Sequence, residues 1–224
     1  MDNDFKQAFD CHCKLTFKYS VSRRPGKKGA GSAVNIQWVA NDELKEVISA
    51  EEIASRVQDL GRQITSDYEG KELVVIGILK GAFIFMADLV RHIDLPLAID
   101  FVRLQSYGSS TSSSGQISIT KDVELPISQR HVLVVEDIVD TGYTLKYLKD
   151  MLSLHHTASV RICCLIDKKE RRKVDVEADY VGFEIPKGFL VGYGLDYDEQ
   201  YRHLPGIYHL NPGYEAKAFI PSDR

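Results

Sequence analysis

A short apolar run followed by three acids and a polar loop constrains the fold of this chain more than any other feature. The run Val132–Val135 is typical of a buried strand. Glu136 and Asp137 end it, and Asp140 precedes a Thr-Gly-Tyr-Thr loop. Beyond the loop an amphipathic pattern predicts a helix, with apolar residues at Leu145, Leu148, Met151 and Leu152. The segment is therefore expected to join the carboxyl end of a strand to a helix N-terminus.

Such a junction is where open α/β sheets bind their ligands. Free backbone N–H groups, the hydroxyls of Thr141 and Thr144, and the flexible Gly142 can surround a phosphate at the helix end. Acids beside an anion site make sense if they face sugar hydroxyls or a hard cation such as Mg²⁺. Glu136 and Asp137 are therefore candidates for binding a sugar or a metal ion.

The remaining patterns alternate between helix and strand. Ser49 and Glu52 form a capping box, which begins a helix over about 50–66. Further helices are expected at 83–93 and 142–154, and buried strands at 73–79, 97–104 and 160–166. This alternation predicts an α/β fold with a mostly parallel twisted sheet flanked by helices.

The composition predicts a globular protein without a membrane span. The chain has 224 residues and is 44% hydrophobic, enough for one α/β domain with a full core. No apolar stretch reaches the length of a membrane helix. The first residues lack the basic and apolar regions of a secretory signal, so a cytoplasmic location is expected.

The formal charge of −4 is unevenly distributed, with about +4 in residues 1–36 and about −8 in the remainder. The stretch 23–32 is basic, rich in glycine and almost free of apolar residues. Residues 1–35 are therefore expected to form a disordered or loosely attached extension, and 36–224 a single domain. An acidic body argues against nucleic-acid binding, although a basic nucleic-acid-binding arm is the alternative reading of the extension.

The four cysteines do not form a disulfide framework. Cys163 and Cys164 are neighbours on a predicted strand, so their side chains should face opposite sides of the sheet. Cys11-His12-Cys13 has no second Cys/His pair to complete a tetrahedral metal site. Reduced thiols fit a cytosolic protein.

The segment 132–145 closely resembles the phosphoribosyl-pyrophosphate (PRPP) signature of the type I phosphoribosyltransferases. The resemblance covers about residues 40–210 and extends to the hypoxanthine-guanine branch through 181–186 and 189–197. It implies a small hood, formed by chain-terminal segments, over the sheet. It also implies transfer of a phosphoribosyl group from PRPP to hypoxanthine or guanine, with Mg²⁺ as cofactor and IMP or GMP plus pyrophosphate as products.

The resemblance assigns roles to the acids and the loop. Asp140 takes the general-base position near the purine N7, and Glu136 and Asp137 lie at the ribose hydroxyls, directly or through Mg²⁺. A carboxylate suits the base role, because its charge also stabilises a cationic ribose ring. The 5′-phosphate is assigned to the loop formed by Thr141, Gly142, Tyr143 and Thr144.

Other segments match the pyrophosphate side of the family site. Lys80-Gly81 matches a pyrophosphate-binding loop that often has a cis peptide before the glycine, and Arg202 matches a pyrophosphate contact. Ser106-Tyr107 matches a pair that closes over the pyrophosphate. These two residues begin a Ser/Thr/Gly-rich stretch, 106–115, which is either a mobile lid or a plain surface loop.

The purine side of the site is matched by four residues. Lys168 corresponds to a donor to the purine O6, and Phe189 to the aromatic residue that stacks on the base. Leu190 matches a position whose backbone reads the purine edge. Asp196 matches an acid associated with Mg²⁺ and with the 2-substituent of the base, which makes Glu136, Asp137 and Asp196 the implied metal ligands.

Several alternatives remain open at this point. A sister phosphoribosyltransferase could prefer xanthine or another nucleobase. A PRPP-sensing regulator could keep the fold and bind nucleic acid, although such proteins often lose the acids or the lid. A receiver-like phosphoacceptor domain fits less well, because its acids come from different strands. The family commonly forms dimers or tetramers, so a homo-oligomer is expected.

Overall fold

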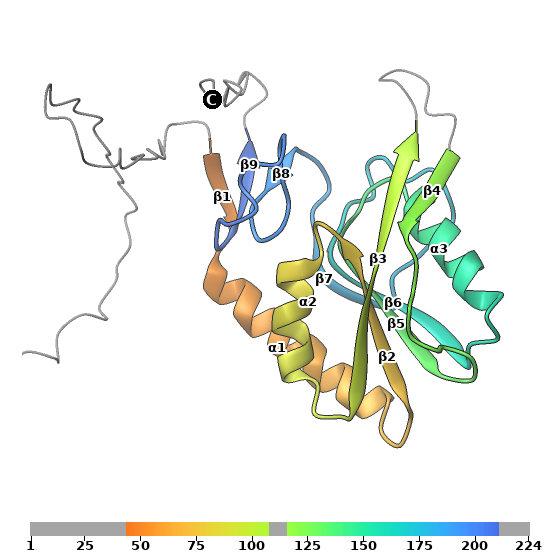
Figure 1. The fold of residues 1–224 in the computed structure, drawn as a ribbon. Helices are drawn as coiled ribbons and strands as arrows, with labels where there is room; N and C mark the ends of the chain where they lie inside the picture. The colour runs from red at the N-terminus through yellow and green to blue at the C-terminus, as the bar shows by residue number, and fades with distance from the viewer. Residues whose placement is uncertain (1–43, 108–115, 211–224) are drawn as a thin grey trace, which may run out of the picture. The chain divides into compact units, whose positions relative to one another are not determined.

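The computed structural model describes residues 44–107 and 116–210 (Figure 1). The expected extension 1–35, with Cys11 and Cys13, lies outside these residues, as does most of the predicted lid. A six-stranded sheet forms the body, and its strands are parallel except for β4, which pairs antiparallel with β3. In spatial order the strands are β4 (Gln116–Lys121), β3 (Leu97–Tyr107), β2 (Leu73–Leu79), β5 (His131–Val139), β6 (Ser159–Asp167) and β7 (Tyr180–Glu184). The predicted α/β class with a mostly parallel sheet is confirmed.

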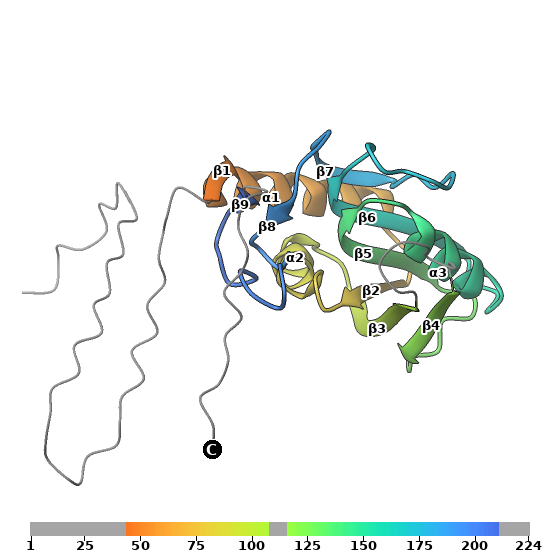
Figure 2. The ribbon, with the colours of Figure 1, turned by 90° about the horizontal axis from the view of Figure 1, so that it is seen from above.

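Helices cover both faces of this sheet (Figure 2). On one face, α1 (Ala50–Asp67) and α2 (Phe83–Leu89) pack on a core that includes Leu133 and Cys163. On the other, α3 (Tyr143–Ser153) packs on a core that includes Val134 and Cys164. The two cysteines are free and buried, and they face opposite sides as predicted. The alternation of side chains along each strand thus supplies two separate cores.

A small second sheet forms the hood that the family resemblance implies. Its strand order is β1 (Leu44–Ile48), β9 (Ile207–Leu210) and β8 (Leu190–Val191). The first and last described strands therefore lie side by side. This sheet brings the segment that carries Phe189 and Leu190 into the hood.

The structure corrects the ends of three predicted elements. The strand expected at 97–104 continues as β3 to Tyr107. A second strand was expected to end at Val135, but β5 continues through both acids to Val139, because Glu136 and Ile138 stay in register with Cys164 and Ile166 of β6. The helix expected at 83–93 ends at Leu89, and a 3₁₀ turn follows over Val90–His92. The polar loop therefore begins at Asp140.

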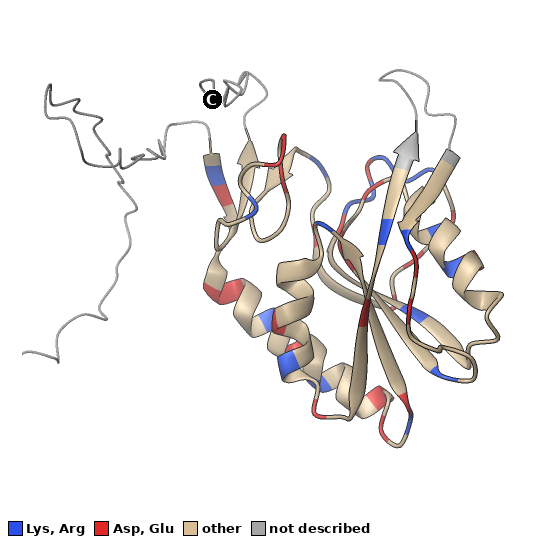
Figure 3. Ribbon diagram, viewed as in Figure 1, with Lys and Arg blue, Asp and Glu red and all other residues tan. Residues whose placement is uncertain are grey.

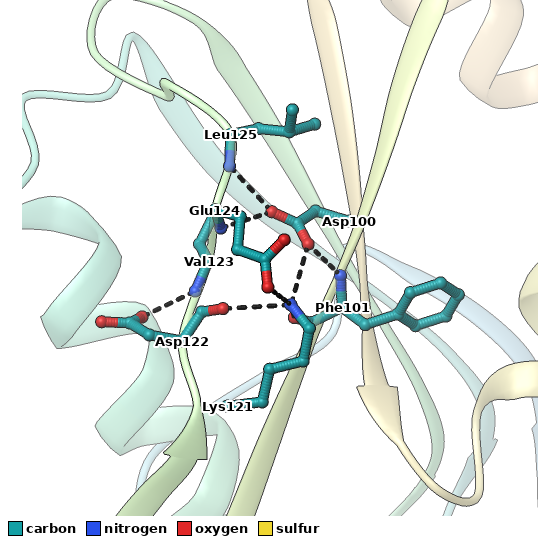
Figure 4. Close-up of polar contacts among 7 residues, drawn as sticks. All are labelled: Asp100, Phe101, Lys121, Asp122, Val123, Glu124 and Leu125. Atoms are coloured by element: carbon teal, nitrogen blue, oxygen red, sulfur yellow. Dashed lines mark hydrogen bonds and ion pairs between the residues drawn. The ribbon is translucent and has the colours of Figure 1, made fainter.

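A buried carboxylate on β3 fastens the segment that follows β4 (Figure 4). Asp100 Oδ2 accepts hydrogen bonds from the backbone N–H groups of Glu124 (2.7 Å) and Leu125 (2.9 Å). Its Oδ1 accepts from the Phe101 N–H (2.7 Å) and from Lys121 Nζ (3.2 Å). Burial raises the pKa of Asp100, but these donors outweigh it, so the net pKa lies below its usual value.

Charged residues lie in the loops, on the helices and on several strands, whereas β2 carries none (Figure 3). None of the helices in the described part of the chain is long and apolar enough to cross a membrane. The charges that bear on function lie at the carboxyl ends of the strands, where β2, β5 and β6 end beside one another.

Candidate active site

Two adjacent carboxylates on β5 form the centre of the site. Glu136 and Asp137 are each only 8% exposed. Burial, followed by the charge of Asp137, raises the pKa of Glu136 well above its usual value, and burial also raises the pKa of Asp137. Asp137 Oδ1 accepts a hydrogen bond from the Ile138 N–H at 2.9 Å. Two adjacent buried acids with raised pKa values form a site suited to a hydroxyl group or a cation.

The turn after β2 lies directly against Asp137. A Cβ atom at Gly81 would overlap the Asp137 carboxylate, so any larger residue would force that carboxylate to move. The peptide bond between Leu79 and Lys80 is cis. The family resemblance implied a cis bond directly before the glycine, between Lys80 and Gly81, so the cis bond lies one residue earlier than expected. The structure thus brings together the Lys80-Gly81 pair and the acids, two of the motifs singled out in the sequence.

The loop between β8 and β9, residues 192–206, is called the hood loop. Its charged side chains lie beside this turn. Arg202 donates to the Gly194 carbonyl at 2.7 Å and forms an ion pair with Asp196 at 2.8 Å. Lys80 Nζ lies 2.9 Å from Glu199 Oε1, and Arg202 Nη2 lies 3.4 Å from Glu199 Oε2. Arg202 also lowers the pKa of Asp137, although less than the hydrogen bonds of that carboxyl do. The two cations expected on the pyrophosphate side therefore share one acidic neighbour, Glu199.

Asp140 and the start of α3 follow β5 without interruption. Gly142 is the N-cap of α3 and has a φ of 85°, and a Cβ atom there would also overlap Val174 and Val176. Asp140 Oδ2 forms an ion pair with Arg171 Nη1 at 3.2 Å, while its Oδ1 is buried without a hydrogen-bond partner. A helix N-terminus with free N–H groups next to an under-satisfied carboxylate suits a phosphorylated ligand.

The other residues of the predicted loop surround the helix start. Thr141 and Thr144 are half-buried, and Tyr143 is exposed. The Thr141 carbonyl accepts a hydrogen bond from the Lys173 N–H at 3.0 Å. The loop is therefore held from one side by the segment after β6.

Arg172 is the side chain that holds this arrangement together. Its Nε donates to the Asp140 carbonyl and its Nη2 to the Val139 carbonyl, both at 3.2 Å, and its Nη1 donates to the Val176 carbonyl at 2.6 Å. It also forms an ion pair with Asp167, the last residue of β6. The planar guanidinium can satisfy acceptors in several directions at once. Arg172 thus connects the Asp140 loop to the strand end next to Lys168.

The sequence analysis missed Arg172 and Glu199. Arg172 closes the charged run 168–172, which has the composition of a solvated turn. Glu199 precedes Arg202 by three residues, and this spacing could have predicted an ion pair between the two. Neither signal specifies the distant partners Asp140 and Lys80.

The residues expected to bind the base lie on two segments. Lys168 is buried at the end of β6, and its N–H donates to the Val139 carbonyl at 3.0 Å. Its Nζ lies 3.7 Å from Glu170 Oε2. Phe189 is 50% exposed and packs edge-to-face on Tyr197 with ring centroids 5.4 Å apart, and Leu190 is buried in β8. A half-exposed aromatic ring leaves area for a planar ligand.

Two predictions find less support in the geometry. Ser106 and Tyr107 end β3, but their side chains and the loop 108–115 lie outside the described residues. Within residues 44–107 and 116–210, no three His, Cys, Asp or Glu side chains gather into a metal-binding group. Asp196 pairs with Arg202. The metal set of Glu136, Asp137 and Asp196 therefore stays a prediction.

Fold and site together define an α/β protein suited to binding a phosphorylated ligand where parallel strands end, with buried acids beside the start of a helix. Comparison with known proteins gives this class a family. The model of the phosphoribosyl transferase domain matches residues 43–198. The chain belongs to the phosphoribosyltransferase family, so the resemblance seen in the sequence is confirmed.

Relatives in the hypoxanthine-guanine branch are similar over most of the chain. The hypoxanthine-guanine phosphoribosyltransferase of Bacillus subtilis is 48% identical over 177 residues, which are 79% of this chain and 98% of that protein. The bifunctional protein TilS/HprT of Listeria monocytogenes is 42% identical over 92% of this chain, which spans only 31% of that protein. A crystal structure of hypoxanthine phosphoribosyltransferase from Staphylococcus aureus has a TM-score of 0.74 at 46% identity, covering 77% of this chain and 94% of that one.

Proposed function

We propose that this chain transfers the 5-phosphoribosyl group of PRPP to hypoxanthine or guanine, giving IMP or GMP and pyrophosphate. The observation that carries the proposal is the close approach of Gly81 to the buried acids, directly before the glycine-capped start of α3. This close approach supports a site in which the pyrophosphate loop, the ribose site and the phosphate site are neighbours. The identity to relatives named hypoxanthine-guanine phosphoribosyltransferase supports the choice of base.

In this proposal the three acids have separate tasks. Glu136 and Asp137 bind the ribose hydroxyls, while the loop 141–144 binds the 5′-phosphate through its N–H groups and hydroxyls. Asp140 takes the proton from the purine N7 and stabilises positive charge on the ribose. Its Oδ1, buried and without a partner, is available for such a contact.

Lys80 and Arg202 bind the pyrophosphate in the same proposal, and the Ser106-Tyr107 pair closes over it. Lys168 donates to the purine O6, Phe189 stacks on the ring and the backbone of Leu190 reads its edge. A donor at O6 favours 6-oxopurines, because adenine has an amino group, itself a donor, at that position. Asp196 completes the pocket near the 2-substituent.

The donor chemistry of the site fits Mg²⁺. Magnesium is usually bound by one or two carboxylates together with substrate phosphates and water. Glu136 and Asp137 supply carboxylate oxygens, with Asp196 as the further implied ligand. When bound, the ion would neutralise the charge of the leaving pyrophosphate. It would also lower the cost of keeping both buried acids ionised.

The family resemblance further supports a cytoplasmic homodimer or homotetramer as the working form. The habit of the family motivates the assembly. Light scattering of the purified chain would measure its mass directly.

The test is a spectrophotometric assay of the purified full chain with PRPP, Mg²⁺ and one purine at a time. Turnover is expected with hypoxanthine and guanine, and none with adenine. A preference for xanthine would reassign the chain to a sister activity. No turnover with any of the four bases would contradict the proposal.

A further inference from the structure

Glu199 sits where a diphosphate would be expected. Its two carboxylate oxygens reach different cations, Oε1 lying 2.9 Å from Lys80 Nζ and Oε2 3.4 Å from Arg202 Nη2. Lys80 comes from the turn after β2 and Arg202 from the hood loop, so the carboxylate bridges two separate parts of the site. An acid placed between the two proposed pyrophosphate-binding cations resembles the anion that they would bind.

The backbone presents this carboxylate in a fixed turn. Asp198, Glu199 and Tyr201 have φ values of 50°, 61° and 73°, a conformation that these residue types rarely adopt. The Glu199 N–H donates to Asp196 Oδ2 at 2.9 Å, and Tyr197 and Gln200 exchange backbone hydrogen bonds. Glu199 is therefore held in an ordered turn, and its exposed side chain extends from this turn to both cations.

We propose that Glu199 is an internal substitute for pyrophosphate, which pairs with Lys80 and Arg202 while the site is empty and must be displaced when pyrophosphate or PRPP binds. The proposal deepens the proposed function and rests on it. The exchange is favourable for pyrophosphate, because its higher charge and greater number of oxygens interact more strongly with the same two cations. No covalent bond changes in this step.

The consequence for catalysis concerns release of the product. A carboxylate that competes for both cations weakens the binding of free pyrophosphate and speeds its departure. Product release limits the turnover of many enzymes. Glu199 would thus set a moderate affinity for the leaving group.

A purely structural role for Glu199 predicts the opposite sign. If the carboxylate only holds Lys80 and Arg202 in their binding positions, its removal should loosen both cations and weaken pyrophosphate binding. If it competes, its removal should tighten binding. The direction of the change therefore separates the two explanations.

The experiment compares Glu199→Gln with Asp198→Asn in the full chain. Both replace an exposed acid in the same turn by its amide and change the net charge equally, but no ion pair joins Asp198 to Lys80 or Arg202. Calorimetry with magnesium pyrophosphate should show about three- to tenfold tighter binding for Glu199→Gln, as expected from the loss of two exposed ion pairs. Asp198→Asn should change affinity less than about twofold, and the difference should shrink at high salt.

Kinetics give a second readout. Glu199→Gln should lower the KM for PRPP and strengthen product inhibition by pyrophosphate. Unchanged or weaker pyrophosphate binding, with wild-type turnover intact, would overturn the role of Glu199 and leave the proposed function standing. A wild-type chain that neither binds pyrophosphate nor turns over a purine would overturn the proposed function and this inference with it.

Discussion

Two groups of buried carboxylates flank strand β2, and they have opposite electrostatic properties. Asp100 on β3 is 7% exposed, and Glu136 and Asp137 on β5 are 8% exposed each. Asp100 receives three backbone hydrogen bonds and one from Lys121, and its pKa is lowered. In the β5 pair desolvation is the largest cause of both raised pKa values. The charge of Asp137 raises the pKa of Glu136 further, while the hydrogen bonds of Asp137, including one from the Ile138 N–H, lower its own pKa without offsetting burial.

Similar solvent exposure therefore accompanies opposite pKa shifts: desolvation dominates for the β5 pair, whereas hydrogen-bond donors outweigh it for Asp100. A buried carboxylate surrounded by donors stabilises the fold, because desolvation is offset by hydrogen bonds to the charged form. A pair of adjacent buried acids is costly to ionise, and its cost is relieved by a ligand that supplies hydroxyls or positive charge. Buried acids with raised pKa values are typical of functional sites. Substitutions in the two regions should accordingly separate activity from stability.

The largest effect is expected for Asp140→Asn, next to the β5 pair. The amide keeps the shape of the side chain but cannot act as a base, so kcat should fall by about 100-fold or more. Pyrophosphate affinity and the free energy of unfolding should change little. Steady-state kinetics and calorimetry measure the two effects. An equal loss of turnover and ligand binding would indicate a structural role for Asp140.

Asp100→Asn should show the reverse pattern, with a loss of stability. The amide loses the charge that its four donors stabilise, so the free energy of unfolding should fall by about 1–3 kcal/mol. Chemical denaturation measures this value. The matched control is Asp122→Asn in the same cluster, whose exposed side chain should contribute less than about 0.5 kcal/mol. An Asp100→Asn protein with the same free energy of unfolding as the wild type would contradict the contrast between the two regions.

The stabilising effect of Asp100 should depend on pH. A carboxyl whose folded pKa is lowered contributes its stability above the unfolded pKa, about 3.9, and loses it as the pH falls through the folded value. The stability difference between wild type and Asp100→Asn should thus stay constant from pH 7 to about pH 5 and shrink below about pH 4. Denaturation at several pH values tests this, and a difference that grew toward low pH would contradict it.

The smallest effect is expected for Glu136→Gln, which should raise stability. Glu136 is a buried acid with a raised pKa, so its replacement by a neutral amide should increase the free energy of unfolding at neutral pH by about 1 kcal/mol or less, while turnover falls. Because the pKa of Glu136 is raised, the gain should diminish at low pH, where the wild-type side chain is also neutral. A Gln variant that is less stable at pH 7 would show that the pair is satisfied by its surroundings.

Much of the fold could be predicted because local patterns determine its elements. The strand Leu73–Leu79 matches its predicted bounds, and the capping box at Ser49 places the start of α1. β5 was predicted too short, because two acids in a row are typical of a loop. Their place in the strand depends on pairing with β6, which no local pattern reports. The short strands β8 and β9 depend in the same way on partners distant in the sequence.

The site was predictable in its motifs and less so in its connections. The acids at 136–140 and the Lys80-Gly81 pair stand in recognisable local contexts. Arg172 gains its importance only when folding brings its guanidinium to the Asp140 carbonyl. Asp100 likewise meets donors from 121–125 only after the chain reverses between β3 and β4.

The small hood sheet has a consequence for the order of folding. Its strand β1 pairs with β9, so nearly the whole described chain must be closed into a loop before this ladder can form. Such a contact of very long sequence separation is expected late in folding, after the central strands have assembled. The same reasoning makes it an early unit to open by local unfolding, ahead of β5. Phe189 and Leu190, at the edge of that sheet, would then sample open states while the acids on β5 stay protected.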